Sequence, residues 1–155
     1  MIDFTIGIEP HGKGRPRATT VGKTARVFTP KKTRDWEKAF RSLSNQYMPE
    51  LLTGPLVVTV HASFHRPKRM STRSTRTGEL LGGYTEGEQW MTSRPDADNV
   101  AKSVLDALSD WYKDDSQVVD LRVTKVYHAM GGKPSVRVTI RGAGEEMVAQ
   151  TRGRG

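Results

Sequence analysis

The chain has 155 residues, enough for one domain with a buried core, although only 35% of them are apolar. It contains no cysteine, which excludes disulfides, thiolate metal sites and a cysteine nucleophile. Its formal charge of +8 favours a polyanionic partner, and nucleic acid is the commonest one. No stretch approaches the roughly 20 apolar residues that span a bilayer, and the first residues lack the apolar block of a signal peptide. We therefore expect a cytoplasmic protein with no membrane partner.

The first part of the chain predicts a strand, a helix and a second strand. Residues 2–8 alternate loosely between apolar and polar and precede residues 12–17, a turn-forming basic loop. A helix is expected from a cap at Thr33 to about Tyr47. Its apolar face would hold Trp36, Phe40, Leu43 and Tyr47. After a break at Gly54 and Pro55, residues 56–64 form the clearest strand in the sequence.

The second part begins with residues 66–94, in which apolar residues recur at neither helical nor strand spacing. This segment predicts a long, mobile, basic loop. A second helix is expected from Asp98 or Asn99 to about Trp111. Its apolar face would hold Val100, Val104, Leu108 and Trp111, with Leu105 at the edge. Strands are then expected at residues 116–127 and 135–141, joined through a glycine-rich turn.

These elements predict one α+β domain over residues 1–141, with a mixed β-sheet packed against two main helices. The last two strands have hairpin-like spacing. Residues 142–155 carry no core-forming pattern and end Arg-Gly-Arg-Gly, so this tail is expected to be disordered.

Charge is distributed unevenly along the chain. Basic residues crowd into 13–41 and 66–76, whereas acidic residues concentrate between 96 and 120. Asp96 and Asp98 stand where an extended approach meets the second helix, because Pro95 disfavours helix at the residue before it. The pair Asp114-Asp115 follows that helix. A basic surface around an acidic pocket suits a nuclease better than a plain DNA-binding module.

Phosphodiester cleavage needs a hydroxide-like nucleophile and relief of the phosphate's negative charge. Mg²⁺ supplies both when a few carboxylate oxygens hold it and leave positions for water and substrate. The carboxylates of Asp96 and Asp98, together with Asp114-Asp115, are therefore candidate metal ligands. Lys102, one helical turn beyond Asp98, is a candidate to stabilise phosphate charge, orient the attacking water or neutralise Asp98.

From the residues alone, plainer interpretations stay open. Asp98 or Asn99 would serve as an ordinary N-cap, and Asp98 with Lys102 as a surface ion pair. Asp114-Asp115 would be a solvated turn, and the basic residues would only keep the protein soluble. A calcium-binding EF-hand loop starting at Asp96 fails, because Ala101 stands where such a loop needs glycine. A non-catalytic nucleic-acid-binding protein with structural aspartates therefore remains an alternative, as does an RNA-directed nuclease.

The fixed spacings point to a family. Residues 95–102, Pro-Asp-Ala-Asp-Asn-Val-Ala-Lys, precede Asp-Ala-Leu at 106–108, Asp-Asp-Ser-Gln-Val at 114–118 and Lys125. This pattern resembles the RusA family of Holliday junction resolvases, which occur in bacteria, prophages and phages. The basic loop at residues 12–17 looks like that of the family. The segment 66–93 is longer and more basic than in compact members.

The resemblance implies a homodimeric α+β nuclease that cuts four-way or branched DNA in paired nicks with Mg²⁺, for which Mn²⁺ substitutes. A water molecule activated by the metal would attack the phosphate. Asp96, Asp98 and Asp115 match the catalytic aspartates, with Asp114 beside the last, and Lys102 matches the essential lysine. Contacts to DNA phosphates are expected from the basic loop and from the basic part of the long segment. These residues are Lys13, Arg15, Arg17, Lys68, Arg69, Arg73 and Arg76.

Overall fold

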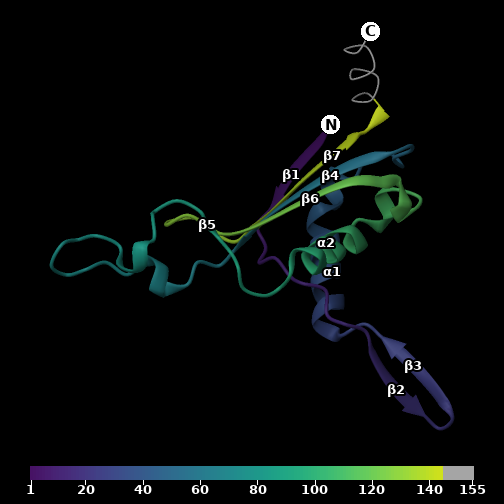
Figure 1. Cartoon of the computed structure of the whole chain (residues 1–155). Coiled ribbons are helices and arrows are strands. Elements are labelled where there is room, and N and C mark those ends of the chain that lie inside the picture. The colour runs from purple at the N-terminus through teal and green to yellow at the C-terminus, as the bar shows by residue number, and fades with distance from the viewer. Residues whose placement is uncertain (145–155) are drawn as a thin grey trace.

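A five-stranded mixed sheet forms the body of the protein in this computed structural model, which describes residues 1–144. The strand order is β1-β7-β4-β6-β5, in which β4 and β6 are parallel and all other neighbours are antiparallel. The strands are β1 (Ile2–Ile6), β4 (Leu56–Phe64), β5 (Gln89–Trp90), β6 (Val118–Tyr127) and β7 (Ser135–Gly142). Two helices, α1 (Lys31–Ser44) and α2 (Ala97–Ala107), lie against one face of this sheet (Figure 1). The predicted α+β class is confirmed.

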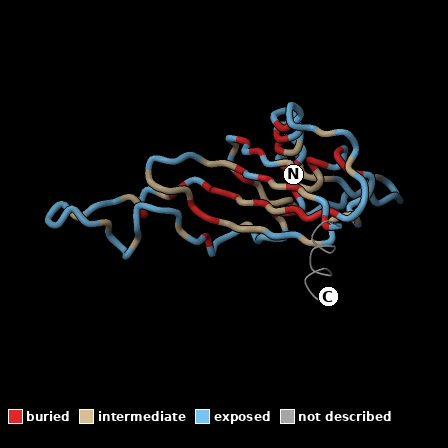
Figure 2. Tube along the Cα trace, turned by 90° about the horizontal axis from the view of Figure 1, so that it is seen from above, coloured by how far each residue is buried: buried red, intermediate tan, exposed pale blue. Residues whose placement is uncertain are grey.

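The core lies between the sheet and the two helices, because strand alternation and helical periodicity direct apolar side chains to the same layer. Val58 and Val60 of β4 are fully buried there, together with Phe40 of α1 and Val104 of α2. Burial of each such side chain stabilises the fold by roughly 1.5–3 kcal/mol. The predicted apolar face of the second helix is confirmed. Figure 2 shows the buried positions running along the strands and helices of the body.

The first helix differs from its prediction at both ends. It begins at Lys31 behind Pro30, so the prediction that Thr33 caps it was wrong. Thr33 is buried inside the helix, and its hydroxyl accepts a hydrogen bond from the Gly14 amide at 3.0 Å, a contact between segments that local sequence does not reveal. The helix ends at Ser44, and Leu43 is exposed on it. Tyr47 lies in a 3-10 helix, where its ring stacks on Phe4.

The second helix and the last strands also have different limits. Helix α2 starts at Ala97 behind Asp96, so Asp98 lies in its first turn and is not its cap. The helix ends at Ala107, and Trp111 closes a separate 3-10 helix, Ser109–Trp111. Strands β6 and β7 do not form a hairpin, because the largely buried β4 lies between them and pairs with both.

The predicted disordered tail was placed from residue 142. Gly142 instead belongs to β7, and Ala143 is buried beside the core. The rest of that prediction, residues 145–155, lies outside the described residues.

Two arms project from the body in different directions (Figure 1). The first is a hairpin of β2 (Arg17–Val21) and β3 (Thr24–Phe28), which the sequence did not predict. The second, residues 66–90, contains the 3-10 helices Lys68–Ser71 and Leu81–Gly83 and ends in β5. Both are largely exposed in Figure 2. We call them the hairpin arm and the long arm.

The long arm is organised around one buried guanidinium. Arg66 is only 4% exposed, and it donates hydrogen bonds to the carbonyl oxygens of Thr85, Met70 and Gly87 at 2.6, 2.7 and 2.8 Å. Its Nε also bonds the Ser71 hydroxyl. The sequence predicts a loop without regular structure in this segment. The structure instead has two 3-10 helices and β5 there, and the hydrogen bonds of the Arg66 guanidinium hold parts of the arm together.

Candidate active site

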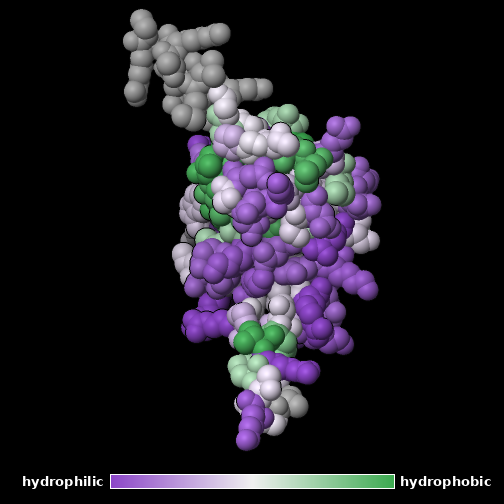
Figure 3. Space-filling model, turned by 90° about the vertical axis from the view of Figure 1, so that its right-hand side faces the viewer, coloured by the Kyte–Doolittle hydropathy of each residue, from purple (hydrophilic) through white to green (hydrophobic). Residues whose placement is uncertain are grey.

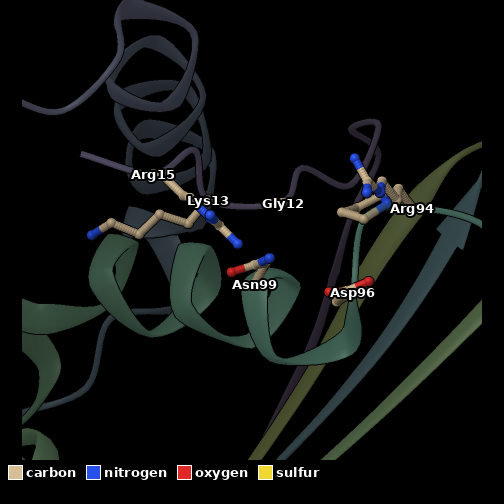
Figure 4. A pocket seen from close by; sticks show the side chains of 7 residues that line it. Gly12, Lys13, Arg15, Arg94, Asp96 and Asn99 are labelled. Atoms are coloured by element: carbon tan, nitrogen blue, oxygen red, sulfur yellow. The ribbon is translucent and has the colours of Figure 1, made fainter. Parts of the chain in front are cut away.

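A trough lies between the basic loop at residues 12–16 and helix α2 (Figure 4). It consists of two adjoining cavities of ≈ 680 and ≈ 390 Å³, which share Lys13, Arg15 and Asn99. The larger is lined by Gly12, Lys13, Arg15, Arg94, Pro95, Asp96 and Asn99. The smaller is lined by Lys13, Gly14, Arg15, Pro16, Asn99, Lys102, Asp106 and Asp115. Three of the predicted catalytic or metal-binding residues, Asp96, Lys102 and Asp115, thus line this trough, and Asp98 lies in the first turn of α2.

The basic loop is held against the start of α2 by two hydrogen bonds and one close packing contact. The Lys13 amide donates to the Asn99 carbonyl at 3.0 Å, and the Ser103 hydroxyl donates to the carbonyl oxygen of His11. Gly12 packs directly on Pro95, since a Cβ atom added there would lie 2.2 Å from the Cβ of Pro95. Only glycine allows this approach. The loop therefore holds a fixed position over the start of α2.

The carboxylates of Asp96 and Asp98 lie at the N-terminal end of α2. Asp96 occupies the N-cap position, but its side chain accepts no capping hydrogen bond. Both side chains are exposed, and neither makes a hydrogen bond or ion pair with any residue in 1–144. The positive end of the helix dipole stabilises negative charge here. Their oxygen lone pairs are therefore free to bind a cation from solvent.

A lysine from the sheet holds the segment that carries Asp96. The ammonium of Lys125, on β6, donates to the carbonyl oxygens of Ser93 at 2.8 Å and Pro95 at 2.6 Å. The Ser93 hydroxyl also bonds the Tyr127 hydroxyl at 2.7 Å. Two residues of one strand thus fix the chain immediately before the first candidate carboxylate.

The second acidic pair is divided between two roles. The carboxylate of Asp114 accepts a hydrogen bond from the Ser116 amide at 2.8 Å and caps the 3-10 helix Asp115–Gln117, which lowers the pKa of Asp114. Asp115 is exposed and lines the smaller cavity. Burial, followed by the negative charge of Asp115, raises the pKa of the neighbouring Tyr112.

Lys13 is surrounded by acidic side chains. Its ammonium donates to Asp106 and lies 4.0 Å from Glu37, and the hydrogen bond to Asp106 raises the pKa of Lys13. One carboxylate oxygen of Glu37 is buried without a hydrogen bond, and burial raises the pKa of Glu37. Lys13 therefore neutralises the charge of Asp106, which lines the smaller cavity with it. Arg15 also lines this cavity and is exposed.

The two acidic segments, Asp96 with Asp98 and Asp114 with Asp115, lie toward opposite ends of the trough. Asp96 lines the larger cavity, and Asp115 lines the smaller one together with Asp106. Residues 96 and 106 are separated by about 15 Å along α2, given a rise of about 1.5 Å per residue. Within residues 1–144, no group of three or more acidic or histidine side chains is close enough to hold one metal ion. Mg²⁺ is commonly bound by one or two carboxylates, with waters and substrate phosphates completing its coordination. Asp96 and Asp98, which accept no hydrogen bond from residues 1–144, are therefore the candidate carboxylates for such an ion.

The predicted DNA-binding residues are distributed over the loop and both arms. Arg15 and Arg17 are exposed at the base of the hairpin arm, and Lys68 and Arg76 are exposed on the long arm. Arg69 lies over the Tyr84 ring and donates to its hydroxyl, and Arg73 pairs with Glu86. Figure 3 shows hydrophilic side chains over most of the face it presents. Apolar ones are seen on the upper part of the body and on the hairpin arm, where Val27 and Phe28 are exposed.

Three residues at the site were not predicted to act there. Arg94 and Asn99 line the trough, and Lys125 holds its wall. Arg94 and Asn99 flank the predicted aspartates in the sequence, so their closeness to Asp96 and Asp98 along the chain could have indicated a place in the site. No local pattern shows that Lys125 reaches the carbonyl groups 30 and 32 residues earlier.

An α+β fold that holds free carboxylates at a helix N-terminus, beside exposed arginines, has the features of proteins that act on phosphodiesters. The sequence matches the family described as "Endodeoxyribonuclease RusA" over residues 7–141. The chain therefore belongs to the RusA endodeoxyribonuclease family. It is also 35% identical over 142 residues to the "Uncharacterized protein YqaN" of Bacillus subtilis (strain 168), a match that covers 90% of this chain and 95% of that protein.

Among the described residues, no helix is both long enough and apolar enough to cross a membrane.

Proposed function

We propose that this protein resolves Holliday junctions or related branched DNA as a homodimer, by divalent-metal-dependent paired nicking in the cytoplasm of a bacterial or phage-infected cell. Membership of the RusA family supports an endodeoxyribonuclease. The observation that carries the proposal is the pair of exposed carboxylates of Asp96 and Asp98 at the start of α2, neither of which has a partner within residues 1–144. Asp96 lines one cavity with the exposed Arg15 and Arg94.

The metal is Mg²⁺, with Mn²⁺ as a substitute, and its ligands are Asp96 and Asp98. When bound, such an ion supplies Lewis acidity to a phosphate oxygen and lowers the pKa of a water molecule. Asp115 contributes negative charge at the other end of the trough. Asp114, already engaged as a cap, is better placed to hold the turn that presents Asp115.

The basic residues position the DNA. Lys102 extends from the exposed face of α2 into the smaller cavity, one turn beyond Asp98, where its charge meets a phosphate. Arg15 and Arg94 line the larger cavity beside Asp96. Exposed cations on the hairpin arm and the long arm extend this positive surface away from the trough, as a branched substrate with several duplexes requires.

Nicking of a synthetic four-way junction tests the proposal. Wild type should cut with Mg²⁺ and be inactive with EDTA, whereas Asp96→Asn and Asp98→Asn should still bind the junction but lose nicking. Asp35→Asn, which removes an exposed carboxylate on α1, is the matched control and should cut like wild type. Equal nicking by Asp98→Asn and wild type would disprove the assignment.

A non-catalytic nucleic-acid-binding protein is the second candidate. It is favoured by the lack of a three-carboxylate cluster within residues 1–144. Under this alternative, junction binding is unaffected by Mg²⁺ and no nicks appear at any metal concentration. Comparison of a DNA junction with duplex RNA separates both candidates from an RNA-directed nuclease.

A further inference from the structure

The hairpin arm belongs to a segment of the chain that carries only positive charge. Residues 10–34 contain eight lysines or arginines and no acidic residue. They include both strands of the arm, β2 and β3, and the start of α1. Because no acidic side chain within this segment neutralises the cations, the arm attracts a polyanion.

The arm is a two-stranded ribbon with neither face covered. All residues of β3 are exposed, and Figure 1 shows both strands projecting beyond the sheet and the helices. The pairing of Val21 with Thr24 leaves Gly22 and Lys23 as a two-residue turn, and the φ of Gly22 is 64°. Glycine adopts this conformation without strain, and so short a turn keeps the tip of the ribbon narrow.

One face of the ribbon carries its arginines. Directly opposed residues of an antiparallel pair lie on the same face. The pairs on this face are Arg17 with Phe28 and Thr19 with Arg26. We call it the arginine face.

The other face carries no charge. Its pairs are Ala18 with Val27 and Thr20 with Ala25. We call it the neutral face. Its side chains are exposed like those of the arginine face, so only the kind of side chain distinguishes the two.

The arginine face lacks a partner of its own. Arg17 and Arg26 are diagonal neighbours across the two strands, at about 7–8 Å. Neither makes a hydrogen bond or ion pair with a described residue. Phe28, beside Arg17, is 45% exposed. Unpaired guanidinium groups next to an exposed aromatic ring suit a ligand that has both phosphates and flat apolar groups, as nucleic acid does.

The width of the ribbon selects one groove of duplex DNA. Two paired strands lie about 4.8 Å apart, and their side chains widen the ribbon further. The minor groove is only about 6 Å wide, whereas the major groove is about 12 Å wide and admits a two-stranded ribbon. Each strand of the arm has five residues. At about 3.4 Å per residue they span about 17 Å, or about five base-pair steps.

The base of the arm is fixed beside the trough. The Thr33 hydroxyl, after β3, accepts a hydrogen bond from the amide of Gly14, before β2, and the two ends of the arm are thereby held together. The His11 ring nitrogen lies 3.0 Å from the same hydroxyl. Arg15, between Gly14 and β2, lines both cavities of the trough. A duplex bound by the arm is therefore held at a defined place relative to the candidate carboxylates.

We propose that the hairpin arm enters the major groove of one duplex of the branched substrate, with the arginine face toward the base edges. Arg26 donates to guanine N7 and O6, the commonest specific contact of arginine in this groove. Arg17, at the base of the arm, contacts a phosphate. This inference rests on the junction binding in the proposed function and adds the groove and the face that make the contact. It does not depend on the metal site or on the nicking reaction.

Moving one charge across the ribbon tests the face. Arg26→Ala removes a cation, and Arg26→Ala combined with Ala25→Arg returns it on the neutral face with no change in net charge. Binding to a four-way junction is measured in EDTA by fluorescence anisotropy, so that no DNA is cut. Both variants should bind about tenfold more weakly than wild type, a loss typical of one arginine–guanine contact.

Thr20→Ala, on the neutral face, is the control and should bind like wild type. Wild-type affinity in the double variant would overturn the proposal, because general positive charge would then explain the binding. Wild-type affinity in Arg26→Ala would overturn it as well.

Chemical footprinting tests the groove. Dimethyl sulfate methylates guanine at N7, in the major groove, and adenine at N3, in the minor groove. Wild type should protect guanine N7 in one duplex of the junction, and Arg26→Ala should leave the same guanines reactive. Guanine protection that is absent, or that is the same in wild type and Arg26→Ala, would overturn the contact in the major groove.

The nicking assay separates this inference from the proposed function. If wild type nicks junctions and the double variant binds them equally well, the arginine face fails and the nuclease proposal stands. If binding and footprint depend on Arg26 but no junction is nicked with Mg²⁺, the groove contact stands and the nuclease proposal fails.

Discussion

The ammonium of Lys125 on β6 lies 2.6 Å from the carbonyl oxygen of Pro95, the residue immediately before Asp96. A second hydrogen bond to the Ser93 carbonyl, at 2.8 Å, holds the same segment two residues earlier. The parallel strand that follows α2 thus determines where the chain enters α2. The position of the first candidate carboxylate depends on a residue 29 positions later in the sequence.

We predict that Lys125→Met lowers the affinity for Mn²⁺ and the nicking rate by about tenfold, since residues that orient metal ligands commonly have effects of this size. Lys125→Arg should lose less, because its guanidinium can still donate to both carbonyl groups. Mn²⁺ binding is measured by titration without DNA, and nicking on a four-way junction. Lys133→Met, at an exposed position in the loop before β7, is the control. Unchanged Mn²⁺ affinity in Lys125→Met would show that the tether does not position the site.

The contact of Gly12 with Pro95 provides the second prediction. Gly12→Ala would place a methyl carbon 2.2 Å from the Cβ of Pro95, so the basic loop or the Asp96 segment must move. Overpacking of this kind costs about 1–3 kcal/mol. We expect a lower free energy of unfolding and reduced nicking. Gly7→Ala is the matched control, because an added Cβ there meets no atom within 4 Å. Equal stability of the two variants would contradict the packing described here.

Local sequence patterns predicted the parts of the fold that depend on periodicity. Val100 and Val104 of α2, and Leu108 directly after it, are buried because these positions recur at helical spacing, and β4 was found from a continuous run of strand-forming residues. The position of Asp96 and Asp98 at the start of a helix could likewise be predicted, because the proline before them and the helix after them are adjacent in sequence.

The remaining features depend on contacts between distant residues. Lys13 bonds Asp106, 93 positions away, and Thr33 bonds Gly14, so neither the acidic surroundings of the loop lysine nor the tertiary contact of Thr33 has a local signal. The start of α1 behind Pro30 does have one, because proline is common at the beginning of a helix. The hairpin arm packs neither face on the core, and its five-residue strands are too short for a periodic pattern that would identify them in the sequence. The separation of the two acidic segments along α2 also follows only from the fold.

The long arm should depend on Arg66. Its guanidinium is buried and donates to several carbonyl groups, and Arg66→Ala would leave those groups without a donor. We expect the free energy of unfolding to fall by about 3 kcal/mol, the size typical of breaking a buried charged network. Urea denaturation measures the change. Arg76→Ala, at an exposed position of the same arm, should change stability by less than about 0.5 kcal/mol. A similar small effect at Arg66 would exclude it as the centre of the arm.

Junction binding should depend on salt through the exposed arginines. Each phosphate neutralised by a cation releases about one counterion, so the logarithm of the affinity falls linearly with the logarithm of salt concentration. Arg17→Ala, at the base of the hairpin arm, should weaken binding and reduce this slope by about one. Lys38→Ala removes an exposed charge on α1 outside both arms, and its slope should match wild type. An unchanged slope in Arg17→Ala would remove the hairpin arm from the DNA-binding surface.

The pH dependence of stability should report the buried carboxyl of Glu37. Burial raises its pKa above the ordinary 4.5, so the folded chain binds this proton more tightly than the unfolded chain does. The folded state is therefore progressively disfavoured as pH rises from the unfolded value through the folded value. Glu37→Gln removes this contribution. The free energy of unfolding of Glu37→Gln minus that of wild type should consequently increase as the pH rises above the ordinary pKa of 4.5. Glu50→Gln, at an exposed position, is the control, and parallel pH profiles for Glu37→Gln and wild type would contradict the burial of a charged Glu37 beside Lys13.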